Sequence, residues 1–200
     1  SIYTHKEIFL REIISNASDA IDKLSYLSLT DDKVPYKKDD FKIKIFVDND
    51  ARTITVRDNG IGMNAEDMEK NLGVIAQSGS LKFKSEKDDL SENDTNIIGQ
   101  FGVGFYSAFM VSDKVTVRSL KYGEETGAQW VSTGTDGYTI TPCPEKTDVG
   151  TEVIMHIKPD TDGENYSTFL DKITIRDLVR KYSDYIRWPI SMDIEDYQFV

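Results

Sequence analysis

The chain has 200 residues, 38% of them hydrophobic, which is enough for one domain with a buried core. Its 35 acidic residues outnumber the 24 basic ones, and a net charge of −11 argues against a surface that wraps nucleic acid unaided. No apolar run approaches the ~20 residues of a membrane-spanning helix, and no signal peptide is expected.

The first thirty residues have the periodicity of an amphipathic helix, predicted from about Thr4 to Leu29. Along it, Glu12, Asn16, Asp19 and Lys23 recur at i, i+4, i+7 and i+11 and form one polar stripe beside a broad apolar face. This stripe has two interpretations. It is either the polar border of a packed helix, or a functional row in which an amide oxygen ligates Mg²⁺ and a glutamate activates a water molecule.

Residues 41–47 and 53–56 alternate at period two around a turn-forming segment, which predicts a hairpin. The second strand leads to Asp58, followed by Gly60 and Gly62. A carboxylate here can accept a hydrogen bond from the exocyclic amine of adenine, and the glycines let the backbone lie against a flat ring. The alternative is an ordinary Asp-Asn-Gly turn.

The middle of the chain is predicted to form a lid, followed by a helix whose N-terminus binds phosphate. Asn64 is a suitable cap for a short helix over 65–72. The glycine-rich segment from 73 to 104 has a charged centre and is expected to be a lid. An apolar helix over 103–111 follows glycines, so its backbone N–H groups would suit phosphate oxygens. The spacing matches neither the Walker loop nor the dinucleotide fingerprint.

The remaining chain predicts a meander of strands followed by helices. Strands are expected at 114–118, 127–132, 137–141, 151–157 and 190–194, and helices at 166–170 and 175–185. This order favours a single α+β domain, a two-layer α/β sandwich. The single cysteine, Cys143, excludes an internal disulfide and fits a reducing, cytoplasmic compartment, and neither His5 nor His156 predicts a metal site.

Four motifs occur in order, at residues 12–20 (EIISNASDA), 58–63 (DNGIGM), 71–76 (NLGVIA) and 98–107 (IGQFGVGFYS). Together they resemble the N-terminal ATP-binding domain of the heat-shock protein 90 chaperones, most of all its bacterial form, over essentially the whole chain. The resemblance implies the Bergerat (GHKL) ATPase fold, with helices on one face of a mixed, mainly antiparallel sheet. It also implies binding of ATP or ADP with Mg²⁺, ATP hydrolysis, lid closure and N-terminal dimerisation controlled by the nucleotide, client proteins as partners and a full-length homodimer.

The resemblance further implies residue roles. Glu12 would activate the hydrolytic water, Asn16 would ligate Mg²⁺, and Asp58 would bind adenine with help from Thr151 through water. The remaining expected nucleotide-binding residues are Asp19, Lys23, Gly62, Met63, Asn71, Gly102, Val103, Gly104 and Phe105.

Two departures from the family pattern change these expectations. Gln77 stands where the family usually has a lysine in the lid, which removes a charged contact to phosphate. The chain is also expected to be a monomeric fragment covering residues 1–200, without the first strand, the middle domain that supplies an arginine, and the C-terminal dimerisation domain. It should therefore bind nucleotide well and hydrolyse it very weakly.

Two other classes of protein remain as alternatives. One is a phosphotransfer or DNA-topology protein on the same fold, which would need a phospho-accepting histidine helix or a more basic surface. The other is an interaction domain that is gated by nucleotide and has no turnover of its own.

Overall fold

The computed structural model describes residues 5–73, 104–192 and 198–199. Eight strands form one sheet in the order β5-β4-β3-β6-β2-β1-β7-β8, and among them only the β1–β7 pair is parallel. The strands are β1 (Ile43–Asp48), β2 (Thr53–Asp58), β3 (Ser112–Leu120), β4 (Gly127–Ser132), β5 (Tyr138–Cys143), β6 (Gly150–Ile157), β7 (Ile190–Met192) and β8 (Gln198–Phe199).

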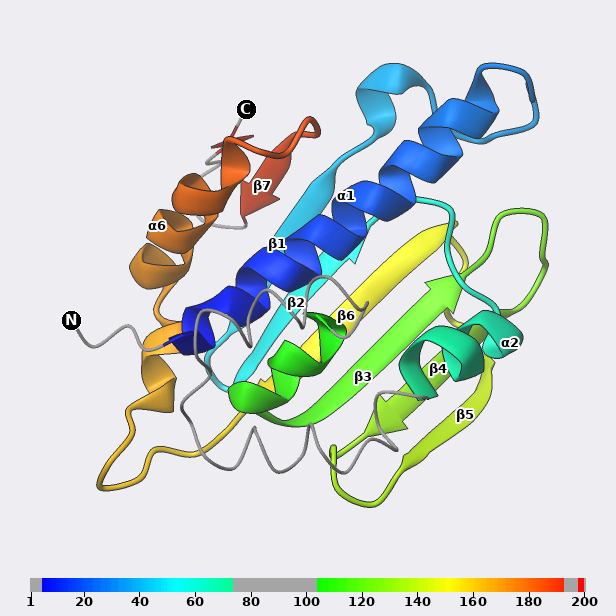
Figure 1. The fold of residues 1–200 in the computed structure, drawn as a ribbon. Helices are drawn as coiled ribbons and strands as arrows, with labels where there is room; N and C mark the ends of the chain where they lie inside the picture. The colour runs from blue at the N-terminus through cyan, green and yellow to red at the C-terminus, as the bar shows by residue number, and fades with distance from the viewer. Residues whose placement is uncertain (1–4, 74–103, 193–197, 200) are drawn as a thin grey trace.

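Helices cover one face of this sheet (Figure 1). The long helix α1 (Ile8–Ser28) lies over it, in nearly the same direction as β2 and β6 in this view, and is preceded by a 3₁₀ turn, η1 (His5–Glu7). The other helical elements are η2 (Lys38–Asp40), α2 (Ala65–Met68), the π-helical turn η3 (Glu69–Gly73), η4 (Gly104–Met110), η5 (Tyr166–Leu170) and α6 (Lys172–Ser183). The predicted two-layer α+β sandwich is confirmed.

The core lies between α1 and the sheet because both elements present an apolar face there. Ile13, Ile14 and Ile21 of α1 are fully buried, as are Ile43 and Ile45 of β1. In β1 and β2 the buried positions largely alternate with less buried ones, as the period-two pattern predicts. The polar stripe of α1 is consequently held at the border of the core.

Most predicted boundaries agree with the structure to within a few residues. The helix predicted over 103–111 is a 3₁₀ helix within its described part. α6 begins three residues earlier than predicted because Asp171 caps it, accepting the N–H of Thr174. β8 was not predicted, since two residues carry no readable periodicity. The expected lid lies outside the described residues over 74–103.

Along the described parts of the chain, no helix combines the length and apolar character needed to cross a membrane.

Candidate functional site

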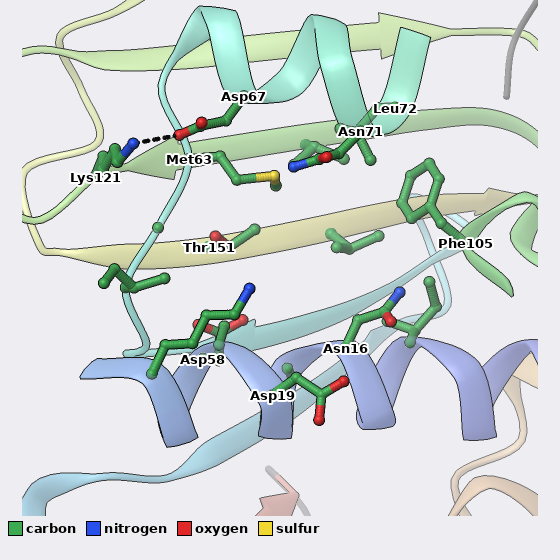
Figure 2. Close-up of a pocket in the computed structure, with 18 of the residues that line it drawn as sticks. Asn16, Asp19, Asp58, Met63, Asp67, Asn71, Leu72, Phe105, Lys121 and Thr151 are labelled. Carbon is green, nitrogen blue, oxygen red and sulfur yellow. Dashed lines mark ion pairs between the residues drawn. The ribbon is translucent and has the colours of Figure 1, made fainter. Parts of the chain in front are cut away.

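A cavity of about 790 Å³ opens between α1, the sheet and the α2–η3 segment. Figure 2 shows α1 along one side of it, α2 and η3 along the other, and Thr151 of β6 at its back. The expected site residues that line it are Asn16, Asp19, Lys23, Asp58, Gly62, Met63, Asn71, Phe105 and Thr151. Elements distant in sequence thus bring nine of the thirteen expected residues to one cavity.

The turn after β2 is clamped between α1 and the end of β3. Ile61 donates its N–H to the carbonyl of Ala20 at 3.0 Å, and Gly60 lies so close to Ala20 that a Cβ there would overlap the helix backbone. Gly62 has φ +75°, and a Cβ on it would overlap the carbonyl oxygen of Leu120. Glycine is required at both positions by close approach, and at the second also by the left-handed conformation.

Asp58 is the buried acid of the site, with 6% of its surface exposed. Burial raises the pKa of its carboxyl from 3.8 to about 7. The backbone N–H groups of Gly60 and Thr151 and the charge of Lys146 lower this pKa, but their effect is smaller than that of burial. The Gly60 N–H donates to Oδ1 at 2.8 Å. Asp58 therefore changes between carboxylate and carboxylic acid near neutral pH, and as a carboxylate it accepts hydrogen bonds from a ligand in the cavity.

Ser119 supports this region from behind and was missed by the sequence analysis. Its Oγ accepts the N–H of Met63 at 2.7 Å and lies 2.7 Å from the Oγ1 of Thr151. A sequence signal for it exists: Ser119 continues the alternation of Val115 and Val117 on β3, so it must face the same side of the sheet. A serine at an inward position of a strand needs a polar partner.

Three residues of the α1 stripe line the cavity and the fourth does not. Asn16, Asp19 and Lys23 are among the lining residues, whereas Glu12 lies outside them. The Oε1 of Glu12 pairs with Arg11 at 2.9 Å, and its other oxygen lies where a Cβ on Gly104 would be. Glu12 thus faces the start of η4, at the end of the stripe farthest from Lys23.

Asp19 is also electrostatically perturbed. Desolvation raises the pKa of its carboxyl, the neighbouring Asp22 raises it further, and Lys23 opposes the shift. The stripe therefore combines an uncharged amide with a carboxylate and a lysine that partly offset each other.

The opposite wall is built by the α2–η3 segment. Asn64 caps α2, accepting the Asp67 N–H at 2.8 Å as predicted. The π-helical turn then places Asn71 across the cavity from Asn16 (Figure 2). Asp67 pairs with Lys121 of the β3–β4 connection at 2.8 Å, at the rim of the cavity. Neither Asp67 nor Lys121 was predicted as a site residue, because an ion pair between residues 54 positions apart has no local signal in the sequence.

Phe105 closes the end of the cavity nearest η4. Its ring packs edge-on against Trp130 of β4, with ring centroids 5.5 Å apart. Gly104 begins η4 but is not a lining residue. Gly102, Val103 and Gln77 lie outside the described residues, so their expected roles rest on the sequence.

The donor set available for a metal is small. Among the described residues, no three His, Cys, Asp or Glu side chains come together in a metal-binding group. The Asn16 amide, which points into the cavity (Figure 2), offers one oxygen. This fits Mg²⁺, which usually keeps several waters and shares phosphate oxygens, and it does not fit an ion that needs a complete protein cage.

A sheet with helices on one face, and a cavity bounded by a polar helical stripe and a buried aspartate, defines a class of nucleotide-binding domain. Residues 3–153 match the family described as histidine kinase-, DNA gyrase B-, and HSP90-like ATPase, and the chain belongs to this family.

Similarity to individual proteins shows which members of this family the chain resembles. The chain is 56% identical over 194 residues, 97% of its length, to the chaperone protein HtpG of Halalkalibacterium halodurans and to that of Clostridium botulinum strain Langeland. It is 55% identical over 196 residues, 98% of its length, to the HtpG of Alkaliphilus oremlandii. It spans 31%, 30% and 31% of these proteins, respectively. The resemblance to the heat-shock protein 90 chaperones is therefore confirmed.

Proposed function

We propose that the chain is the ATP-binding and ATP-hydrolysing N-terminal domain of a chaperone that assists protein folding. The observation that carries the proposal is the buried Asp58 in a cavity whose α1 wall presents Asn16. A buried carboxylate with backbone donors on one side and open space on the other is suited to the amine of adenine. An amide on the neighbouring wall is suited to a phosphate-bound cation.

The proposed binding mode runs from Asp58 toward η4. Asp58 accepts the adenine amine, with Thr151 assisting through water, and the backbone of Gly62 and side chain of Met63 lie against the base. Asn71 lies near the ribose and α-phosphate, on the wall opposite Asn16 (Figure 2). The phosphates are proposed to bind at Phe105 and at Gly102, Val103 and Gly104, while Asp19 and Lys23 hold water or ribose.

Hydrolysis is proposed to use Glu12 as general base. Its carboxylate lies one helical turn before Asn16, beside the start of η4, and this position supports the proposal that it orients a water and takes its proton. Mg²⁺, held by Asn16, would neutralise charge on the phosphate oxygens when nucleotide is bound. Because Gln77 stands where the family usually has a lysine, one expected cation for that charge is lost, and we expect weak turnover from this chain alone.

The wider function is proposed from the relatives. Residues 1–200 form one nucleotide-binding domain with a lid over about 73–104, whose closure depends on the nucleotide. In the full-length protein this state would control N-terminal dimerisation and the handling of unfolded client proteins in the heat-shock response. We place the protein in the cytoplasm, in keeping with its single cysteine, with neither nucleic acid nor membrane as a partner.

Isothermal titration with ADP, ATP and GTP, each with and without Mg²⁺, tests the proposal. We expect ADP and ATP to bind, with a contribution from Mg²⁺, and GTP to bind far more weakly because its base presents a carbonyl oxygen to Asp58. Equal affinities for GTP and ATP, or no binding of either, would refute the assignment of the cavity.

A further inference from the structure

Ser119 is fully buried on β3, with 0% of its surface exposed, and it is not a lining residue of the cavity. Its hydroxyl nevertheless touches two residues that are. It lies 2.7 Å from the backbone nitrogen of Met63 and 2.7 Å from the Oγ1 of Thr151, its register partner on β6. A third contact joins it to the carbonyl of Gly150 at 3.0 Å.

The hydrogen atoms in this cluster are determined by counting donors. A serine hydroxyl donates one hydrogen bond and accepts two. The Met63 N–H can only donate and the Gly150 carbonyl can only accept, so Ser119 accepts from the first and donates to the second. Its remaining contact is then satisfied only if Thr151 donates its own hydroxyl proton to Ser119.

The reverse arrangement leaves one contact unpaired. If Ser119 donated to Thr151, its oxygen would lie 3.0 Å from the Gly150 carbonyl oxygen with no proton between them. Because Ser119 is fully buried, such an unpaired contact of its hydroxyl oxygen is unfavourable. The arrangement that satisfies all three contacts is therefore the stable one.

This arrangement decides what Thr151 presents to the cavity. Because its proton is directed to Ser119, the Thr151 oxygen offers only lone pairs to the cavity, either to the base or to the water through which Thr151 is proposed to assist. The ionised carboxylate of Asp58 likewise offers only acceptors. The wall formed by these two residues thus accepts hydrogen bonds and donates none through its side chains.

We propose that Ser119 is a positioning residue that makes the cavity selective for purines with a 6-amino group over purines with a 6-oxo group. This inference rests on the proposed adenine nucleotide site. A 6-amino group donates to an acceptor wall, whereas a 6-oxo group places an acceptor against acceptors. Sites that pair buried polar groups in this way discriminate strongly, because the wrong ligand leaves those groups unpaired.

The test compares the Kd values of ADP and inosine diphosphate, which differ at the 6-position and N1 of the base. ADP is titrated directly and inosine diphosphate by displacement of ADP, at pH 8. Ser119→Ala frees the Thr151 proton to donate into the cavity. We expect the preference for ADP to fall about tenfold, equivalent to ~1.4 kcal/mol, with part of the change seen as tighter binding of inosine diphosphate.

Thr151→Val supplies the matched control, because valine keeps the shape and removes the hydroxyl. In Ser119→Ala/Thr151→Val no freed proton exists, so the double variant should show the same preference as Thr151→Val alone. Ser119→Thr, which keeps the hydroxyl, should retain the wild-type preference. Ser119→Cys, a poor hydrogen-bond partner of similar size, replaces the alanine variant if that variant does not fold.

The outcomes separate this inference from the proposed function. If wild-type protein binds ADP and Ser119→Ala weakens both nucleotides equally, Ser119 is only a structural support for Met63 and the inference is overturned. The inference is also overturned if Ser119→Ala/Thr151→Val shows a weaker preference for ADP than Thr151→Val alone. If wild-type protein binds neither nucleotide, the proposed function fails and the inference fails with it.

Discussion

The backbone N–H of Gly60 donates to the Oδ1 of Asp58 at 2.8 Å inside a turn that α1 and the end of β3 enclose. This bond orients one carboxylate oxygen, yet it does not offset burial, which raises the pKa of Asp58 to about 7. The apo protein therefore holds an acid that is half ionised near neutral pH. Its ligand-binding form, the carboxylate, is the form that burial disfavours.

The affinity for ADP should consequently depend on pH. Adenine needs the carboxylate as acceptor, so binding is strong above pH 7 and weakens as pH falls through the pKa of Asp58. With a pKa near 7, about one molecule in ten is ionised at pH 6, and we expect roughly tenfold weaker binding there than at pH 8. Titrations across this range provide the measurement. An affinity that is constant from pH 6 to pH 8 would contradict the role of Asp58.

Asp58→Asn should abolish ADP binding while stabilising the apo domain. The amide keeps an oxygen for the Gly60 N–H but carries no charge to bury, and it presents an NH₂ group where the base needs an acceptor.

The sign of the stability change follows from the pKa of Asp58. Because the folded-state pKa of about 7 exceeds the ordinary 3.8, the folded protein binds more protons between these values, and wild-type stability falls as pH rises from 4 to 7. Thermal unfolding should therefore show the advantage of Asp58→Asn growing from pH 6 to pH 8. Asp48→Asn, at the exposed last residue of β1 in the same hairpin, is the control and should change neither property. A variant that binds ADP like wild type would disprove the assignment.

The sequence was sufficient for the fold and for the residues that act locally. Period-two alternation predicted the hairpin that ends at Asp58, and the 3.6-residue period predicted the α1 stripe. Each of these signals depends only on residues that are close together in the sequence, so it can be recognised without tertiary information. Glycines 60 and 62 were readable as a close approach, although only the structure identifies Ala20 and Leu120 as the groups approached.

The parts that the sequence could not predict depend on contacts between distant strands. Ser119 meets Thr151 because β3 pairs with β6, and Lys121 meets Asp67 because the β3–β4 connection lies beside α2. Strand order is a property of the whole sheet, so it produces no local pattern in the sequence of the segments that it brings together. The π-helical turn that places Asn71 is likewise set by packing, since the sequence predicted a regular helix through it.

Gly62→Ala should destabilise the domain and remove nucleotide binding. The new Cβ would overlap the Leu120 carbonyl, and φ +75° is strained for any L-residue. We expect a loss of more than ~2 kcal/mol of unfolding free energy, measured by denaturant titration.

Gly137→Ala is the matched control for this variant. Gly137 has φ +87°, and a Cβ there meets nothing within 4 Å, so its substitution reports backbone strain alone, roughly 1 kcal/mol. The difference between the two variants measures the clash with β3. If they prove equally destabilised, the turn can move away from Leu120 and is not clamped.

Glu12→Ala should retain ATP binding and lose turnover. Glu12 is not a lining residue of the cavity, and base recognition is assigned to Asp58 and the Mg²⁺ contact to Asn16, so little binding energy depends on it. A general base typically contributes ~10²–10⁴-fold to rate. The isolated domain should already be nearly inactive, because further positive charge at the γ-phosphate is worth ~10³-fold or more. Turnover is therefore compared in the full-length protein.

Glu7→Ala is the control for this comparison. Glu7 is also a partly buried glutamate near the start of α1, but it pairs with Lys181 of α6 at 2.7 Å, away from the cavity. We expect it to leave both ATP affinity and turnover near wild type. Glu12→Ala should bind ATP within a few-fold of wild type and hydrolyse it at least a hundredfold more slowly. Hydrolysis by full-length Glu12→Ala at a rate close to that of Glu7→Ala would mean that another group takes the proton from water.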